Sequence, residues 1–179
     1  MTGITIAGAN RKDKTGFVLS DEYTKEYEVG VDLQKFDTLG SLNLYSMNIR
    51  KHKLVFNGLS EADAIDTIPL GVYFPAEGEY TFAFDDQLYN SNEVDTIMLI
   101  DYQKEIQKNL KYGNYTFTAH KGTDDSRFAI LIRLAKKPDI ETDLEEIYDA
   151  EGPRKVIINN QLFIIKEGEM YNAVGTKVR

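Results

Sequence analysis

The amino-acid sequence predicts an all-β protein, in which a β-sandwich is followed by a small C-terminal β-meander of three strands. Two segments, Gly78–Phe82 and Gly113–Phe117, repeat the pattern Gly-x-Tyr-Thr-Phe, where a glycine precedes an aromatic-rich alternating strand. Short strand-like runs recur up to residue 134, separated by turn signals and not by long helices. This spacing favours a sandwich or barrel over a βαβ fold. Further apolar runs follow at the C-terminal end of the chain.

Ten strands are expected in the first part of the chain, because each run combines alternating or β-branched residues with flanking turn residues. They span residues 3–8, 15–20, 26–33, 42–49, 52–58, 67–74, 79–84, 95–102, 114–119 and 126–134. In the last of them Phe128, Ile130 and Ile132 share one face, while Arg127 and Arg133 point to the other. The order of the strands is not given by the sequence, so jelly-roll and immunoglobulin-like topologies are both open.

Two segments of the sandwich region have a different character. We expect one helical turn at residues 60–64, because Ser60 can cap it and Asp63 follows three residues later. Residues 104–111 mix helix-forming residues with polar alternation around Ile106. We favour a strand or turn there, leading into the second Gly-x-Tyr-Thr-Phe segment.

Residues 8–15 come within one residue of a phosphate-binding P-loop. Asp13 takes the place of the second glycine, where its carboxylate would face the phosphates. A P-loop also leads into a helix, whereas the next residues, Gly16-Phe17-Val18-Leu19, favour a strand. We therefore predict a polar hairpin turn.

The composition argues against several classes of function. The absence of cysteine excludes disulfides, thiolate zinc sites and cysteine nucleophiles. A net charge of −8 argues against nucleic acid as a partner, and no apolar run is long enough to span a bilayer.

The histidines, His52 and His120, lack metal-helix spacing, and the oxygen-rich loop 85–95 lacks EF-hand spacing. No Gly-x-Ser-x-Gly motif is present, and no pair of carboxylates stands out as a glycosidase pair. We assign no catalytic, cofactor-binding or metal-binding residue and expect a protein that is not an enzyme.

Three regions are predicted along the chain: a sandwich domain over 1–138, an acidic linker over 139–153 and the meander over 154–179. The composition changes after Lys137-Pro138, and the next thirteen residues contain seven carboxylates and no basic residue. Like charges favour a solvated segment, and a short helix over 142–148 is the alternative.

The meander is expected to form strands at 154–158, 161–166 and 169–174, with Asn159-Asn160 in a tight hairpin turn. Its apolar side chains then occupy both faces. One face holds Ile157, Leu162, Ile164, Tyr171 and Ala173, and the other holds Val156, Ile158, Phe163, Ile165, Met170 and Val174. Such a small sheet cannot bury two faces by itself, so it must dock on the sandwich, on an upstream domain or on another protein. The candidate docking residues are Ile157, Leu162, Phe163, Ile165 and Tyr171.

The leading hypothesis is therefore a non-enzymatic interaction module that presents the meander. A second hypothesis is a carbohydrate-binding sandwich, or an accessory domain of an upstream glycoside hydrolase. The chain has 11 tyrosines and 9 phenylalanines, and exposed aromatic rings provide apolar platforms for sugars. Tyr89, Tyr102 and Tyr112 are the candidate ligand-binding residues.

The segment from Arg154 to Gly175 combines a basic-apolar opening, an Asn-x-Gln-Leu-Phe-Ile-Ile core, a turn at Gly168, and Tyr171-Asn172 followed by Gly175. With these elements it resembles the C-terminal tails of secreted and surface proteins from gut Gram-negative anaerobes of the Bacteroidota type, which are linked to sorting signals. Residues 69–82 and 113–128 are similar to the β-sandwich module that often precedes such tails.

This resemblance implies the C-terminal part of a larger exported protein, located outside the cell or on its surface. Its implied partners are the upstream domains of the parent protein and components of the secretion machinery or envelope, and no catalytic residues carry over. Residues 1–10 have neither the cationic region nor the apolar length of a signal peptide. A cytoplasmic location is therefore the alternative if Met1 is the native start.

Overall fold

The structure is a computed structural model that describes residues 2–36, 40–85, 94–135, 154–158, 161–166, 169–172 and 174–178. The chain divides into two units, Met1–Pro138 and Asp139–Arg179, and each is described by itself. The predicted acidic linker lies outside the described residues.

The first unit is built almost entirely from strands, which confirms the predicted fold class. Its elements are β1 (Thr2–Gly8), β2 (Arg11–Leu19), β3 (Leu33–Gln34), β4 (Asn43–Met47), β5 (Lys53–Leu59), α1 (Glu61–Ala64), β6 (Ile68–Phe74), β7 (Gly78–Phe84), β8 (Val94–Asp101), β9 (Ile106–Asn109), the 3₁₀-helix η2 (Leu110–Tyr112), β10 (Tyr115–Ala119) and β11 (Gly122–Leu134).

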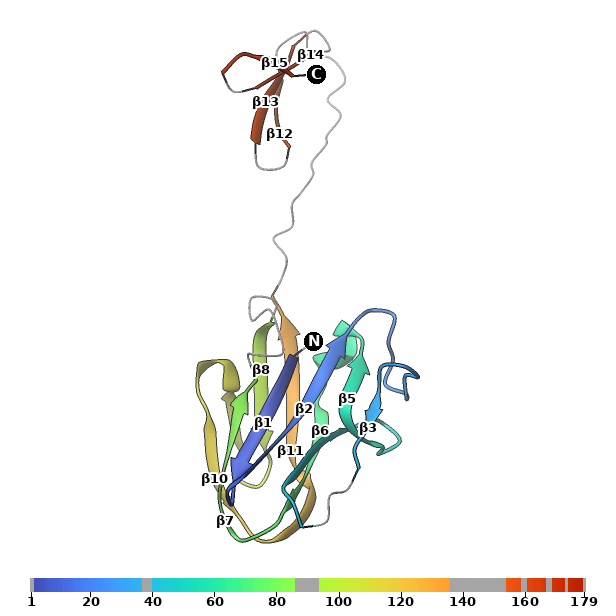
Figure 1. Cartoon of the computed structure of the whole chain (residues 1–179), viewed down its shortest axis with the longest axis vertical. Coiled ribbons are helices and arrows are strands. Elements are labelled where there is room, and N and C mark those ends of the chain that lie inside the picture. Colours follow the sequence, from blue (N-terminus) through green and yellow to red (C-terminus); the bar gives the residue numbers. More distant parts are fainter. Residues whose placement is uncertain are drawn as a thin grey trace. The chain divides into compact units, whose positions relative to one another are not determined.

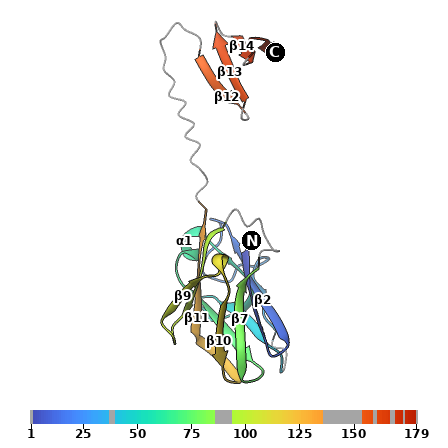
Figure 2. The same ribbon diagram turned by 90° about the vertical axis from the view of Figure 1, so that its left-hand side faces the viewer.

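One hydrogen-bonded path joins ten of these strands in the order β10-β7-β1-β2-β5-β4-β6-β11-β8-β9, and β3 pairs with β5 beside it. The β2–β5 pair is parallel, and the other pairs are antiparallel. Figure 1 shows the path folded over, so that strands β1 and β2 lie in front of β6, β11 and β8. In Figures 1 and 2, α1 and the end of β11 lie at one end of the unit, and the β10–β11 connection lies at the other.

The two Gly-x-Tyr-Thr-Phe segments become neighbouring strands, β7 and β10, which pair Phe82 with Tyr115 and Tyr80 with Phe117. These four aromatic side chains are buried on one face, as the alternation predicts. They pack on the opposite layer, where the Phe128 ring of β11 lies 4.9 Å from the Phe117 ring, centroid to centroid. The aromatic cluster is therefore the centre of the sandwich core.

Two local predictions are confirmed at turns. β1 and β2 form a hairpin across Ala9 and Asn10, whose positive φ angles of 48° and 56° suit a tight two-residue turn. The near-match to a P-loop is thus a hairpin. In α1, the Ser60 hydroxyl accepts a hydrogen bond from the Asp63 backbone N–H at 3.0 Å, as a capping residue does.

The predicted strand at residues 26–33 is wrong, since only Leu33 and Gln34 pair with a strand. Here carboxylates bind the backbone N–H groups that a strand would pair. Glu28 accepts from the N–H of Thr24 at 2.8 Å, and Asp32 accepts from the N–H of Glu28 at 3.1 Å. Local bonds of this kind favour turns over a sheet.

The second unit is a sheet of four antiparallel strands in sequence order, not the three predicted: β12 (Arg154–Ile158), β13 (Gln161–Lys166), β14 (Glu169–Asn172) and β15 (Lys177–Val178). β14 ends two residues earlier than expected, because the Asn172 side chain accepts hydrogen bonds from the N–H groups of Val174 and Thr176. With Gly175 at φ 83°, this turn returns the chain to form β15.

The register of this sheet pairs Ile164 with Tyr171 and, one position along, Ile165 with Met170. Successive residues point to opposite faces, so apolar residues lie on both. No described side chain of this unit is buried: Leu162 is 41% exposed, and Phe163, Ile165 and Tyr171 are half-buried. The side chain of Ile157, the fifth candidate docking residue, lies outside the described part of the chain.

Candidate functional site

A buried ion pair joins Asp101, at the end of β8, to Arg127 of β11. The side chains are 1% and 5% exposed, and two parallel bonds link them: Nε to Oδ1 at 3.0 Å and Nη2 to Oδ2 at 2.8 Å. The guanidinium carbon also lies 4.7 Å from the ring centroids of Phe117 and Phe128. Arg127 is therefore held from several sides inside the sandwich.

The burial of Arg127 corrects the prediction that it points away from Phe128. The pairing of β11 with β6 shifts register between Asp124 and Phe128, which marks a β-bulge. A bulge locally breaks the alternation of side chains and re-aims one of them. Arg133, farther along the same strand, is exposed as predicted.

β10 is linked to this ion pair through side chains. The Tyr115 hydroxyl donates to Asp101 Oδ2 at 2.8 Å, and Arg127 Nη1 donates to the Thr118 carbonyl at 3.2 Å. The sheet path pairs β10 with β7 only, so these bonds connect its other edge to β8 and β11. We call the cluster of Asp101, Tyr115 and Arg127 the clasp. Its side chains join β10 to β8 and β11, strands with which β10 has no backbone pairing.

The clasp alters the acidity of its members. Burial alone would raise the pKa of the Asp101 carboxyl group, but the hydrogen bonds from Arg127 and Tyr115 outweigh it and hold the pKa below its usual value. Burial and the hydrogen bond to Asp101 together raise the pKa of the Tyr115 hydroxyl to about 12. Asp101 is thus a carboxylate and Tyr115 a neutral donor across the physiological pH range.

A polar pocket of about 510 Å³ lies beside the clasp, next to the β10–β11 connection. The β8–β9 turn and the β10–β11 connection form its walls. The residues that matter for its chemistry are Gln103, Lys104, Thr118, Lys121, Thr123 and Arg127. The pocket therefore offers amide, hydroxyl and cationic groups, together with the imidazole of His120 and the carboxylate of Asp124, around a buried arginine.

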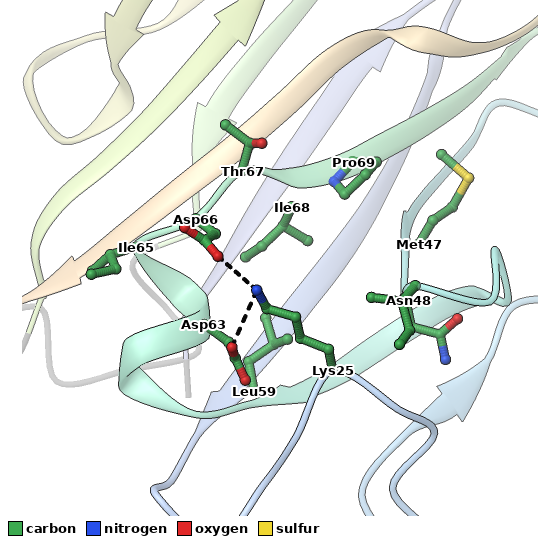
Figure 3. Close-up of a pocket in the computed structure, with 11 residues that line it drawn as sticks. Lys25, Met47, Asn48, Leu59, Asp63, Ile65, Asp66, Thr67, Ile68 and Pro69 are labelled. Carbon is green, nitrogen blue, oxygen red and sulfur yellow. Dashed lines mark hydrogen bonds and ion pairs between the residues drawn. The ribbon is translucent and has the colours of Figure 1, made fainter.

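An apolar pocket of about 500 Å³ lies beside α1, where β5 leaves β4 and pairs with β2 (Figure 3). Its apolar wall includes Leu59 and Ile68. Lys25 lies across it, with Nζ 2.6 Å from Asp66 and 3.3 Å from Asp63, and these hydrogen bonds raise the pKa of Lys25. An apolar wall and charges that are already paired are compatible with many ligands, so this pocket does not indicate a particular class of ligand.

The structure separates the predicted ligand-binding tyrosines. Tyr102 is 52% exposed and directly precedes Gln103 and Lys104 of the polar pocket in sequence, but it lines neither pocket itself. Tyr112 is 75% exposed on η2 and lines neither pocket. Tyr89 lies outside the described residues.

The clasp was not predicted from the sequence. Its hydrogen bonds join residues 14 and 26 positions apart, and no motif links them. An arginine inside a strand that is otherwise apolar, Arg127 before Phe128, was the one local signal.

No group of three or more histidine, aspartate or glutamate side chains that could hold a metal ion occurs among the described residues. Within the same ranges, no helix has the length and hydropathy to cross a membrane.

Comparison with known proteins places the sandwich in a family. A family model described as a domain of unknown function, DUF8693, matches residues 6–132, from β1 to β11. No curated protein and no solved structure matches the chain significantly. The match covers more than half of the chain and ends before the second unit. The chain therefore belongs to the DUF8693 family of domains of unknown function.

Proposed function

We propose that the chain is a non-enzymatic module of a larger exported or cell-surface protein, in which the sandwich carries a small sheet that docks on a partner. We call residues 154–179 the docking unit. One observation carries the proposal: the docking unit has apolar side chains on both faces, and none of its described side chains is buried.

The physical reason is the size of the unit. A sheet of four short strands is a single layer, so it has no second layer to cover its apolar faces. Phe163, Ile165 and Met170 on one face, and Leu162 and Tyr171 on the other, stay in contact with water in the isolated unit. Exposed apolar patches of this kind mark interaction surfaces.

The charge of the docking unit supports a partner in the secretion machinery or envelope with an acidic, apolar groove. Residues 154–179 contain five basic and two acidic residues, in a chain whose net charge is −8. The resemblance of this segment to sorting-type tails supports the same class of partner and a location outside the cell or on its surface.

Substitution of Phe163 in the parent protein, expressed in its source organism, tests the proposal. Phe163→Asp places a charge on one apolar face and is expected to abolish surface display, measured as cleavage by protease added to intact cells. The matched control is Thr176→Asp, since Thr176 is an exposed polar residue between β14 and β15 and belongs to neither apolar face. Unchanged display of Phe163→Asp, or equal loss in both variants, would contradict a docking role for the apolar faces.

Carbohydrate binding by the sandwich is a second candidate function, and the position of Tyr102 favours it. Its exposed ring is next in sequence to the polar side chains Gln103 and Lys104 of the polar pocket. Tyr102 does not line the pocket itself, and its exposed ring could provide an apolar platform for a sugar that extends out of it. A glycan array probed with the native chain and with Tyr102→Ala tests this, and binding that is equal in both would exclude Tyr102 as the platform.

A further inference from the structure

The polar pocket gathers positive charge in a protein that is negative overall. Lys104 and Lys121 both line it, and neither ammonium group forms an ion pair with a described residue. His120, at the same rim, lies 3.4 Å from the carboxylate of Glu77. Two unpaired lysines at one pocket raise the local concentration of anions.

The clasp adds donors at the pocket wall. A guanidinium group has five N–H donors, and the bonds of Arg127 to Asp101 and Thr118 use the Nε donor and one donor on each Nη. Each Nη therefore keeps a second N–H without an acceptor among the described residues. Because Arg127 is buried and lines the pocket, an acceptor from the pocket would satisfy these donors.

The carboxylates of Asp101 and Asp124, near the pocket, already accept hydrogen bonds from other groups of the protein. Asp101 is neutralised by Arg127, and both of its oxygens accept hydrogen bonds. Asp124 Oδ1 accepts from the backbone N–H groups of Ser126 at 3.1 Å and Arg127 at 3.0 Å. Among the lining residues, the charge left over is that of Lys104 and Lys121 against Asp124, and the carboxylate of Glu77 lies beside His120 at the rim.

We propose that this pocket binds a small hydroxylated carboxylate, of the chemical class of an acidic monosaccharide. The carboxylate group is bound by Lys104 and Lys121 together with the remaining donors of Arg127. Gln103 and Thr123 offer the amide and hydroxyl groups that bind the hydroxyls of the sugar. A volume of about 510 Å³ is enough for one sugar ring with ordered water. This inference rests on the carbohydrate-binding candidate function and is independent of the docking unit.

Titration of the full 179-residue chain with sodium glucuronate, followed by amide chemical shifts at low ionic strength, tests the inference. Saturable shifts are expected at residues 103–104 and 118–124. The same titration with glucose and with sodium phosphate is expected to bind at least tenfold more weakly, because glucose lacks the charge and phosphate lacks the hydroxylated ring. Added salt should weaken glucuronate binding.

A double variant, Lys104→Gln with Lys121→Gln, is expected to weaken glucuronate binding at least tenfold while its thermal unfolding stays that of the native chain. The control is Lys12→Gln, an exposed lysine on β2 outside the pocket, which should bind like the native chain. Equal binding of glucose and glucuronate would support a carbohydrate site but overturn its selectivity for anions. The inference also fails if phosphate binds as tightly as glucuronate, if glucuronate causes no shifts, or if Lys12→Gln weakens binding as much as the double variant.

Discussion

Arg127 shows how a charged side chain is kept inside this sandwich. Two aromatic rings lie against its guanidinium group, and Asp101 supplies the opposite charge. The pair is bidentate, and Tyr115 and the backbone N–H groups of Gln103 and Lys104 also donate to Asp101. The cost of burying an ion pair falls when its other hydrogen-bonding groups are satisfied, as those of this carboxylate are.

Removal of the charge on Asp101 is the sharpest test of the clasp. Asp101→Asn leaves Arg127 buried without a counter-charge, so we expect the free energy of unfolding to fall by about 3–5 kcal/mol. Urea denaturation measures this change. Asp21→Asn, at an exposed carboxylate in the β2–β3 loop, should change it by less than about 0.5 kcal/mol, and a similar loss in both variants would contradict the prediction.

The pKa of Tyr115 predicts how stability changes at alkaline pH. Because this pKa is raised to about 12 in the folded protein, the hydroxyl adds stability that is complete below about pH 10, the usual value for tyrosine. That stability is lost as the pH rises from 10 towards 12. Tyr115→Phe should remove this part of the alkaline loss, which thermal unfolding between pH 8 and pH 12 measures.

The lowered pKa of Asp101 predicts that the stability of the fold decreases as the pH falls into the acidic range. Its pKa is lower in the folded protein than in the unfolded chain, so its contribution to stability is present above about pH 4. The contribution is lost as the pH falls through the lowered value. Acid titration of the native chain and of Asp101→Asn should show a shallower loss of stability in the variant.

At the scale of strands, three aromatic rings cover glycines on neighbouring strands. Tyr80 pairs with Gly8 across β7 and β1, Phe56 with Gly16 across β5 and β2, and Tyr45 with Gly71 across β4 and β6. A Cβ atom added at any of these glycines would lie within 2.6 Å of the ring that covers it. These pairs occur along the sheet path from β7 to β6. Because glycine has no Cβ atom, each one leaves room for the neighbouring ring on the surface of the sheet.

Gly71→Ala tests this packing. The added Cβ would lie 2.1 Å from the buried Tyr45 ring and 2.4 Å from Asp125 Oδ1, to which the Tyr45 hydroxyl donates a hydrogen bond. We expect a loss of about 1–3 kcal/mol in the free energy of unfolding. In a Tyr45→Ala background the cost of Gly71→Ala should shrink, and a double-mutant cycle that shows purely additive costs would contradict the account.

At the scale of the whole molecule, the chain combines a family domain with a second unit of different charge. The DUF8693 match ends at residue 132, and the core cluster lies entirely in the first unit. In the sequence, the seven carboxylates of residues 139–151 come after this unit and before the basic docking unit. The sandwich therefore has the core that independent folding requires.

Truncation after Pro138 is expected to leave the sandwich folded. Residues 1–138 should unfold cooperatively, with a midpoint within about 2 °C of the corresponding transition of the whole chain, because the core residues all remain. Calorimetry of both proteins measures this. Loss of a cooperative transition in residues 1–138 would show that the sandwich needs the docking unit for its stability.

Local patterns in the sequence were sufficient for most of the strands, for a hairpin within residues 8–15 and for the cap at Ser60, although β2 begins four residues before the predicted strand. They failed at residues 26–33, where carboxylates bind the backbone, and at Asn172, whose side chain ends β14 and allows a fourth strand. In both places polar side chains competed with the strand for backbone N–H groups, which alternation alone does not reveal.

The sequence by itself determined the all-β class, the aromatic face of β7 and β10 and the two apolar faces of the docking unit, because strand periodicity is a property of adjacent residues. The tertiary structure alone decided the strand order, the burial of Arg127 and the polar pocket. A bulge turned Arg127 inward, and its partner Asp101 lies 26 residues away on another strand. These features depend on which distant segments meet, and that is settled only when the two layers pack on a common core.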